Sequence, residues 1–440
     1  MKKIKSKDDY PLSRVPLNGK LPTWKVMVVR LGGLSSLPVL MVGLTLGYGL
    51  TFWQGFWAFF FGSIILQLVG WALGTIAARE GLSSSLLSRW SGFGNFGSAL
   101  IGLVIAVSTI GWFGIQNSIF ANGLFKATGF FNFEIWSILT GLVLTFLVVY
   151  GVRFLSMKAN IALPLFVFGT IYALTEMLIG TSLTDLINSS PPGQLIPMSK
   201  AITMVAGSFI IGAVITPDMC RFVHTGKDVF WICLISTFLG ELGFGMIGVL
   251  MSHAARSADV DVIMLSFSGI FGALMVVFST VKSNNLNLYS ASLGITNFFD
   301  IVIKIKLSRA VITLFVGSIG TILSVVGVIG FFTSFLMLLA EAIPPIVGII
   351  VIDYYVLKRH RKVLDDSRIN GRLPDMVEVW NPVAIIAWSI GFVVGRYVTD
   401  FGIPVTNSLL VGGLVYLIAM KLYAIIASKK VVEFKMVDML

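Results

Sequence analysis

The sequence KVMVVRLGGLSSLPVLMVGLTLGY occupies residues 25–48, and a cluster of glycines, serines and a proline interrupts its apolar run. About 20 apolar residues are needed to cross about 30 Å of hydrocarbon, so the run has the length of a membrane-spanning helix. Unwound backbone inside a membrane is tolerated only where it is buried in protein or lines a cavity. The stretch GGLSSLP at residues 32–38 therefore predicts a broken membrane helix beside an internal site.

The rest of the chain has the composition of an integral membrane protein. Of its 440 residues, 56% are hydrophobic and 12% are charged, whereas a typical soluble domain carries about 25% charged residues. Each span must satisfy its own backbone hydrogen bonds, which favours helices where alternating barrel strands are absent. We expect an all-α integral membrane protein with about 12 transmembrane helices. Their expected ranges are 25–48, 53–77, 94–121, 133–150, 158–179, 200–216, 229–251, 266–290, 308–327, 330–355, 380–398 and 406–427.

The distribution of Lys and Arg predicts the orientation of these spans. An even number of spans places both termini on one side, and that side holds almost all of the basic residues. The opposite side holds Lys126, Lys200, Arg256 and Arg396. Because cytoplasmic loops are enriched in Lys and Arg, we expect both termini in the cytoplasm and a multi-pass protein of the inner (plasma) membrane. This asymmetry accounts for the net charge of +11 without a nucleic-acid partner.

Enzymes and metal proteins are not supported by the sequence. Cys220 and Cys233 form neither a disulfide framework nor a paired metal site, and the histidines lack metal-ligand spacing. We find no convincing set of paired carboxylates, clustered histidines or an activated nucleophile. The longest hydrophilic stretch, at about 356–379, is too short for a soluble core. We therefore expect no enzyme activity, no metal and no cofactor.

The sixth span carries a second group of small residues, five spans after the first. Residues 206–209 read AGSF, and Thr216 and Pro217 follow. In transporters built from inverted repeats, the binding site lies where corresponding helices of the two halves are interrupted. Glycines also permit close helix packing, which is the alternative explanation for either segment alone. The two segments together favour a ligand site.

Two further spans carry unusual residues near mid-membrane. Residues 109–114 read TIGWFG, which places Trp112 mid-span between two glycines. Most membrane tryptophans lie at the interface, but Trp112 lies in the middle of its span. We therefore interpret it as an aromatic wall facing a cavity. Residues 279–285 read STVKSNN within an apolar helix. Such a polar cluster is costly unless it faces a bundle interior or water, and it indicates a functional site.

Two acidic residues are also expected within the membrane. Glu241 falls in the seventh span and Glu341 in the tenth. Either is a candidate counter-ion for Lys282 or Arg30. The alternative is that each lies near a helix end and reaches the interface.

At these positions the chain resembles the nucleobase:cation symporter family, in its cytosine permease branch, over nearly its whole length. The resemblance rests on the order and placement of several short motifs. They are TLG at 45–47, GL at 49–50, GWFG at 111–114, GSF at 207–209, RF at 221–222, LY at 288–289, LG at 293–294, AIPP at 342–345 and DY at 353–354.

The resemblance implies a leucine-transporter-like fold, with a five-plus-five inverted repeat and two extra helices. It implies alternating access around a central site. The expected parts are a cytoplasmic tail at 1–24, a first repeat at 25–179, a second at 200–355, accessory helices at 380–427 and a second cytoplasmic tail at 428–440.

The resemblance also implies roles for individual residues. Trp112 and Phe209 would stack on the two faces of a flat base, while Ser208, the backbone near Gly207 and Asn284 would meet its polar edge. This chain departs from cytosine permeases at three positions: Thr109 replaces a glutamine, Ile211 a serine and Ser36 a phenylalanine. The resemblance makes cytosine the first candidate substrate. Because of the three departures, another pyrimidine, a purine or a related ring is the next candidate.

A further departure concerns the coupling ion. Sodium-coupled relatives complete their cation site with two adjacent hydroxyls on the eighth span, but here Lys282 precedes Ser283. A protonated amine would repel sodium and donate hydrogen bonds to the carbonyls of the first span. We expect sodium-independent transport, with a proton as the coupling ion and Glu241 or Glu341 as its partner. The alternatives are a sodium-coupled symporter, a uniporter or channel, and a membrane sensor that binds without transport.

Overall fold

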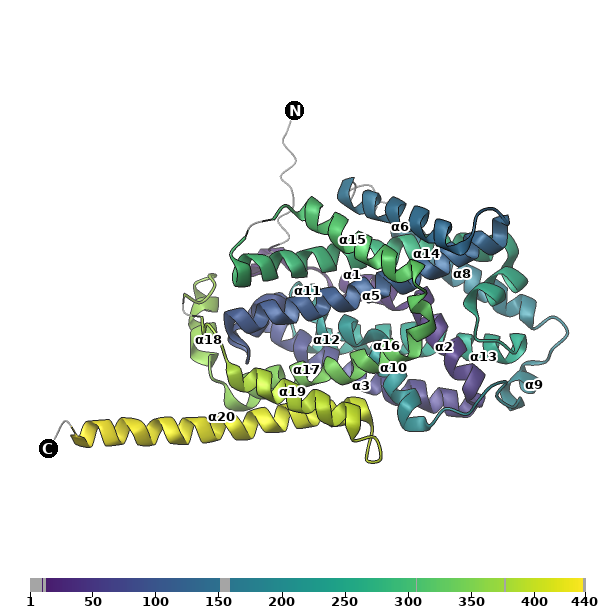
Figure 1. Cartoon of the computed structure of the whole chain (residues 1–440). Helices are drawn as coiled ribbons and strands as arrows, with labels where there is room; N and C mark the ends of the chain where they lie inside the picture. The colour runs from purple at the N-terminus through teal and green to yellow at the C-terminus, as the bar shows by residue number, and fades with distance from the viewer. Residues whose placement is uncertain (1–9, 11–12, 151–158, 306, 376, 438–440) are drawn as a thin grey trace.

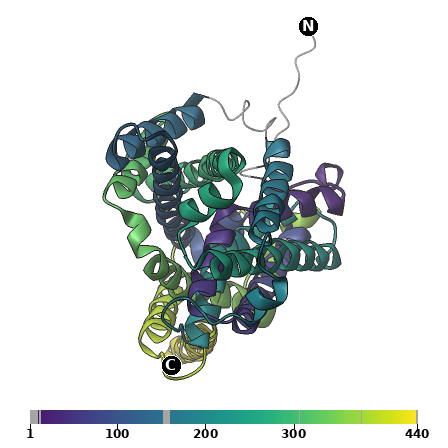
Figure 2. The same cartoon turned by 90° about the vertical axis from the view of Figure 1, so that its right-hand side faces the viewer.

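The helices of this protein form a single elongated bundle. The computed structural model describes residues 10, 13–150, 159–305, 307–375 and 377–437. In this described part all regular secondary structure is helical, and most long helices run along one common direction (Figure 1). Figure 2 shows the same bundle turned by 90°, with many helices nearly end-on. The all-α prediction is confirmed.

The first half of the chain supplies the first five expected spans. Its main helices are α1 (Thr23–Leu34), α2 (Leu37–Gly49), α3 (Phe52–Glu80), α5 (Gly94–Thr128), α6 (Phe133–Tyr150) and α8 (Ala159–Met177). A short helix, α4 (Ser84–Trp90), connects α3 to α5, and η1 (Leu17–Gly19) precedes α1. The expected start of the fifth span, residue 158, lies outside the described residues.

The second half supplies the remaining spans, several of them in segments. Spans six to eight are formed by α10 (Met198–Val214), α11 (Thr216–Cys220), α12 (Gly226–Ile235), η2 (Ser236–Gly243), α13 (Phe244–Ala255) and α14 (Val260–Phe298). Spans nine to twelve are formed by α15 (Arg309–Val325), η4 (Val328–Phe331), α16 (Phe332–Ala342), α17 (Pro344–Val351), η5 (Ile352–Leu357), α19 (Pro382–Tyr397) and α20 (Pro404–Val437). The connecting helices are α9 (Leu183–Asn188), η3 (Phe299–Ile303) and α18 (Arg361–Ile369).

The length and apolar composition of these helices indicate which of them can span a membrane. Six helical segments of the described chain are long and apolar enough to cross a membrane, and the bent pair α1 and α2 adds a seventh. Shorter apolar helices supply the rest, at 133–149, 166–177, 198–214, 310–325 and 382–397. Together they correspond to the twelve expected spans.

The first span is broken where the sequence predicts it. Helices α1 and α2 meet at an angle of 48°, and Ser36 between them has extended backbone, with φ −152° and ψ 161°. Pro38 lies in the first turn of α2, where its missing N–H costs no helical hydrogen bond. The break therefore follows from helix-terminating chemistry within an otherwise apolar run.

The sixth span is interrupted later than expected. Helix α10 continues through residues 206–209 and ends at Val214, and Pro217 lies in the first turn of α11. Gly207 serves close packing instead: a Cβ added there would lie 2.2 Å from the backbone oxygen of Leu336 on α16. The small residues at 206–209 therefore do not interrupt the sixth span, and the break lies at Thr216 and Pro217, because a small residue permits close helix contact as readily as it permits a break.

The core of the bundle includes a close contact between α5 and α14, the third and eighth spans. A Cβ on Gly294 would lie 2.3 Å from the backbone oxygen of Gly102, so only glycine allows this approach. The contact places the TIGWFG segment and the STVKSNN segment on neighbouring helices. Both segments then lie in the middle of the bundle.

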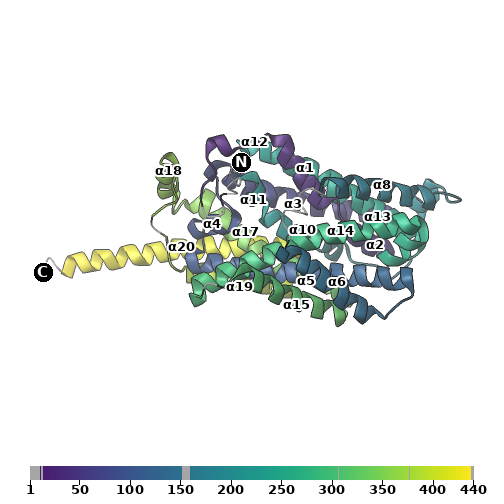
Figure 3. The same ribbon diagram turned by 90° about the horizontal axis from the view of Figure 1, so that it is seen from above.

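The two ends of the bundle differ. Helix α18 and the 356–379 connection lie at one end, and α9 lies at the other (Figure 1). Helix α20 extends past the other helices at the α18 end (Figure 3). The Lys- and Arg-rich connections expected in the cytoplasm include the one carrying α18.

Candidate functional site

Trp112 lies on α5 in the interior of the bundle, with 6% of its surface exposed. Its ring makes edge-to-face contacts with Phe335 at 5.4 Å and Phe332 at 6.1 Å between centroids, both on α16. The neighbouring Gly111 is required there, since a Cβ would lie 2.5 Å from the Phe335 ring. Trp112 is therefore held at a fixed angle in the interior and does not lie at a membrane interface.

Phe209 lies on α10 and packs against the same apolar cluster that contains Trp112. The guanidinium carbon of Arg30, on α1, is 5.7 Å from the centroid of its ring. Arg30 also donates hydrogen bonds to Thr216 Oγ1 at 2.6 Å and to the Gly212 carbonyl at 3.3 Å. This buried cation fixes one side of Phe209. An arginine inside the apolar first span is the sequence signal for it, but spacing alone does not identify its partner.

The polar segment of α14 contacts the break in the first span at two points. The Lys282 amine donates a hydrogen bond to the Gly32 carbonyl at 2.7 Å, which is the contact expected between this amine and a first-span carbonyl. On the other side of the break, the Leu37 N–H donates to Ser279 Oγ at 3.2 Å. The Gly32 carbonyl and the Leu37 N–H lie on either side of the break, and side chains of α14 supply their hydrogen-bond partners. Ser36, at the break itself, is 8% exposed.

Other predicted residues make local hydrogen bonds that limit what each can offer a ligand. The Asn284 amide donates to the Phe113 carbonyl at 3.3 Å, and its oxygen accepts from Asn287 at 3.2 Å. The Thr109 hydroxyl donates within α5, to the carbonyls of Ile105 and Ala106. Both residues therefore contribute to the α5 and α14 packing in this structure. Ser283, next to Lys282, is half-buried.

Among the described residues, neither membrane carboxylate forms an ion pair with Lys282 or Arg30, the counter-ions expected from the sequence. Glu341 forms an ion pair with Arg396 on α19 at 3.2 Å, and Glu241 contacts Ser208 Oγ at 2.8 Å. Neither is paired with Lys282, whose amine bonds a backbone carbonyl. Glu341 is thus paired with α19, whereas Glu241 contacts Ser208 of the candidate substrate site. Sequence spacing could not distinguish these partners, because they lie on helices distant along the chain.

Among the described residues, no group of three or more His, Cys, Asp or Glu is arranged to hold a metal ion. The residues gathered here are aromatic rings, hydroxyls, one amine, one guanidinium and one carboxyl. Such a set can stack on a flat molecule, bond its polar edge and exchange protons. It lacks the ligand set of a metal-assisted hydrolase.

Comparison with known proteins gives a consistent family assignment. The sequence model of the family described as permease for cytosine/purines, uracil, thiamine, allantoin matches residues 20–419. The cytosine permease of Escherichia coli (strain K12) is 29% identical over 412 residues, covering 93% of this chain and 94% of that protein.

Solved structures show the same fold. The inward-facing conformation of Mhp1 aligns with a TM-score of 0.79 at 19% identity, covering 94% of both chains. Mhp1 in a closed conformation with bromovinylhydantoin bound, from the nucleobase-cation-symport-1 family, aligns with a TM-score of 0.75 at 20% identity, covering 94% of this chain and 95% of that chain. The leucine-transporter-like fold implied by the sequence motifs is confirmed at the level of architecture.

Proposed function

This chain belongs to the family of permeases for cytosine, purines, uracil, thiamine and allantoin, and we propose that it imports a flat, nucleobase-like heterocycle by alternating access. Cytosine is the first candidate substrate, since the cytosine permease of E. coli matches the chain over 93% of its length. Another pyrimidine, a purine or a related ring follows.

The observation that carries this proposal is the contact between the polar segment of α14 and the break between α1 and α2. Lys282 and Ser279 bond backbone groups on either side of the break, at 2.7 and 3.2 Å. Membrane transporters built from inverted repeats bind substrate and coupling ion at such discontinuous helices. Polar groups of this kind within the bilayer are costly unless they serve an interior site.

Aromatic stacking supports a flat substrate. In this proposal Trp112 and Phe209 contact the two faces of the ring, which suits any heterocycle because each has a π face. Ser208, the backbone at Gly207, Thr109, Asn284 and Ser36 lie around its edge. The Thr109 hydroxyl hydrogen is already used within α5, so this side chain would accept a hydrogen bond from the substrate.

The proposed site of action is the inner (plasma) membrane, with both termini in the cytoplasm. The basic connections at the α18 end of the bundle support this orientation, because Lys and Arg accumulate on the cytoplasmic side. Transport would then proceed from the α9 end toward the α18 end (Figure 1).

We further propose that transport is independent of sodium. The Lys282 amine donates to the Gly32 carbonyl, an oxygen of the kind that a hard cation would require. An ammonium group held beside Gly32 repels a sodium ion. Its hydrogen bond also occupies the carbonyl oxygen that would coordinate the sodium ion. In this proposal a proton, instead of sodium, is the ion coupled to transport.

Uptake of labelled cytosine into proteoliposomes tests both parts of the proposal. We expect uptake to persist when sodium is replaced by potassium or choline at fixed pH. Lys282→Ser would restore two adjacent hydroxyls with Ser283 and should make uptake respond to sodium, whereas Lys282→Met removes the charge without adding an oxygen ligand and should not. Loss of most wild-type uptake without sodium would return the protein to the sodium-symporter alternative.

A membrane sensor is the rival from another class. It would bind a nucleobase without moving it across the membrane. A thermal-shift screen against nucleobases identifies the ligand, because binding at about 100 times Kd adds roughly 2.7 kcal/mol of stability. A ligand that stabilises the protein but shows no flux would favour the sensor.

A further inference from the structure

Glu241 is a carboxyl buried in the middle of the bundle, on the π-helical segment η2, with no exposed surface. Ser208 Oγ lies 2.8 Å from its Oε1. Its Oε2 has no hydrogen-bond partner among the described residues. An ionised carboxylate with a single hydrogen bond in such surroundings is costly, because buried charge needs a partner for each oxygen.

The hydrogen count at Ser208 bears on the charge of this carboxyl. Ser208 Oγ lies 2.7 Å from the Val205 carbonyl as well as 2.8 Å from Glu241 Oε1. A hydroxyl has one hydrogen, and a helical serine commonly gives it to a carbonyl of the preceding turn. Ser208 Oγ is the donor in both contacts, so its single hydrogen is shared between the Val205 carbonyl and Glu241 Oε1. An ionised Glu241 would therefore accept one shared hydrogen bond at Oε1 and none from the described residues at Oε2.

Arg30 is a buried cation on one of the helices that pack against η2. It lies on α1, which packs against η2 together with α3, α12 and α13. Its guanidinium is held by Thr216, by Gly212 and by the Phe209 ring, and not by an ion pair with Glu241. The thiol of Cys233 on α12 interacts with Cys220. The other titratable side chains of these helices and of α10 lie at helix ends: Lys25, Arg79, Glu80, Lys200, Lys227, Asp228 and His253.

The influences on the charge of Glu241 oppose each other. Burial favours a neutral carboxyl, whereas the hydrogen bond donated by Ser208 and the positive charge of Arg30 favour a charged one. Because Arg30 is on α1 and Glu241 on η2, a shift of α1 relative to η2 would change the balance between them. A proton could then bind in one conformation and leave in the other.

We propose that Glu241 is the proton-carrying group of this permease and that Ser208 links its charge to the substrate site. The inference rests on the transport function proposed above. Glu241 takes a proton from water on the outside when the carboxylate becomes a carboxylic acid. It returns that proton to cytoplasmic water when Arg30 stabilises the carboxylate. Substrate binds the protonated form, so each import cycle carries one proton inward.

Glu241→Gln tests this role. A glutamine amide offers Ser208 Oγ a carbonyl oxygen as a protonated carboxyl does, but it cannot release a proton. In proteoliposomes, E241Q is expected to keep cytosine counterflow and to lose accumulation driven by an inward proton gradient. Cytosine affinity of the wild type should fall as pH rises, by up to about tenfold per pH unit through the titration, and E241Q should lack this dependence.

Glu341→Gln is the matched control, since it also removes a buried carboxyl, one held by Arg396 at 3.2 Å. E341Q is expected to retain proton-driven accumulation and the pH dependence of binding. If E241Q accumulates cytosine under a proton gradient as well as the wild type, Glu241 does not carry the proton.

An infrared measurement separates this inference from the transport proposal. The spectrum of the full-length wild type minus that of E241Q should contain the carbonyl stretch of a protonated carboxylic acid, and this band should shift in Ser208→Ala. The absence of such a band would overturn the inference even if cytosine is transported. Its presence in a protein that transports no nucleobase would uphold the protonated carboxyl and sink the proposed substrate.

Discussion

Trp112 illustrates how much a single side chain can contribute to such a site. Its ring is held by Phe332 and Phe335, with interplanar angles of 74° and 80°. Edge-to-face contacts of this kind favour one orientation of the indole and leave a ring face for another partner. A rigid aromatic surface loses little conformational entropy when a flat ligand stacks on it. This is why the stack contributes affinity while the polar edge contacts contribute selectivity.

Replacing Trp112 by alanine should weaken cytosine binding strongly. Stacking is worth about 1 to 3 kcal/mol per base, so we expect Kd to rise by about 5- to 150-fold. Trp112→Phe should have a smaller effect, because a ring remains, and Phe209→Ala should resemble W112A. Calorimetric titration of purified protein measures these changes. The control is Trp57→Ala on α3, a tryptophan with 47% of its surface exposed, which should leave Kd unchanged. A W112A affinity within twofold of wild type would remove Trp112 from the site.

At the scale of elements, small residues decide which helices meet. Gly294 on α14 and Gly102 on α5 let two backbones approach closely, and Gly207 does the same for α10 and α16. In lipid, helix association depends on such packing, since the surrounding hydrocarbon is as apolar as the side chains. The contact between α5 and α14 places Trp112 and Lys282 on neighbouring helices in the interior of the bundle.

Gly294→Ala should therefore destabilise the protein. Its Cβ would lie 2.3 Å from a backbone oxygen of α5, which cannot move aside as a flexible side chain can. Overpacking of this kind costs about 1 to 3 kcal/mol, and we expect a lower melting temperature in detergent together with weaker cytosine binding. Gly330→Ala is the control, because no atom lies within 4 Å of a Cβ at that position. Equal melting temperatures for the two variants would contradict this account of the helix contact.

The elements also show where sequence reasoning succeeded and where it could not. Twelve spans follow from apolar length, and the break at Ser36 follows from glycine, serine and proline together. The position of the break in the sixth span does not follow from the sequence, because Gly207 packs against α16 within a continuous helix. The π-helical segment that carries Glu241 left no recognised signal either. At the site, the sequence predicts a bond from Lys282 to a carbonyl of the first span, which the structure identifies as that of Gly32, whereas the pairing of Glu341 with Arg396 depends on the fold.

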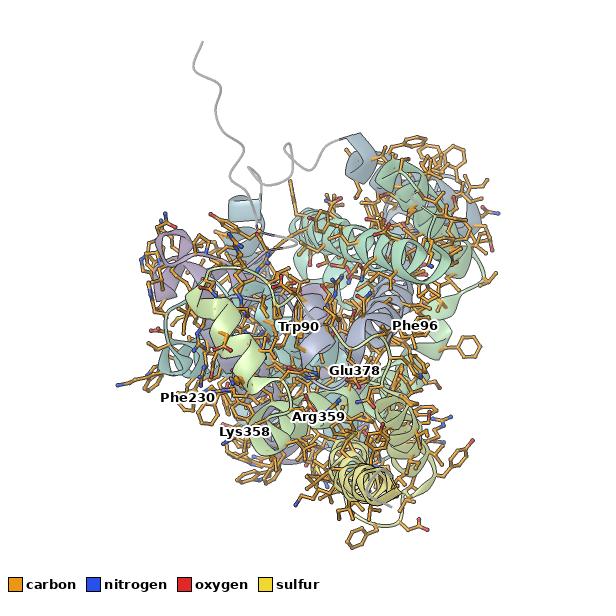
Figure 4. All side chains as sticks on the ribbon, turned by 90° about the vertical axis from the view of Figure 1, so that its left-hand side faces the viewer. Trp90, Phe96, Phe230, Lys358, Arg359 and Glu378 are labelled. Carbon is orange, nitrogen blue, oxygen red and sulfur yellow. The ribbon has the colours of Figure 1, made fainter. Side chains whose placement is uncertain are left out.

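Considered as a whole molecule, the bundle is held together at the α18 end by charged contacts between distant segments. Figure 4 views that end, where Arg359 and Glu378 lie close together and bond at 2.9 Å. Nearby, Glu80 at the end of α3 is fully buried and accepts a hydrogen bond from Tyr354 at 2.6 Å. Arg368 of α18 reaches the same carboxylate at 3.2 Å.

Arg14 ties the segment before α1 to this cluster. Its side chain is 4% exposed and lies 3.1 Å from Glu80 Oε2. It also donates to the Ser367 hydroxyl at 2.7 Å and to the Arg372 carbonyl at 2.8 Å. One arginine thus joins three parts of the chain that no local sequence pattern brings together.

Arg14→Ala and Arg79→Ala form a matched pair for testing these contacts, since both arginines contact Glu80. Removing one member of a buried pair costs about 3 to 5 kcal/mol, because the other charge is left buried. Tyr354 and Arg368 still support Glu80, so we expect R14A to fall at the lower end of that range. Arg79 is 42% exposed and lies 3.6 Å from Glu80, and exposed pairs contribute about 0 to 1 kcal/mol. Thermal unfolding in detergent should therefore show a clear loss for R14A and a small one for R79A. Equal losses would mean that the exposed contacts of Arg79 with Glu80 and Asp365 stabilise this end as much as Arg14 does, which would contradict a special role for the segment before α1.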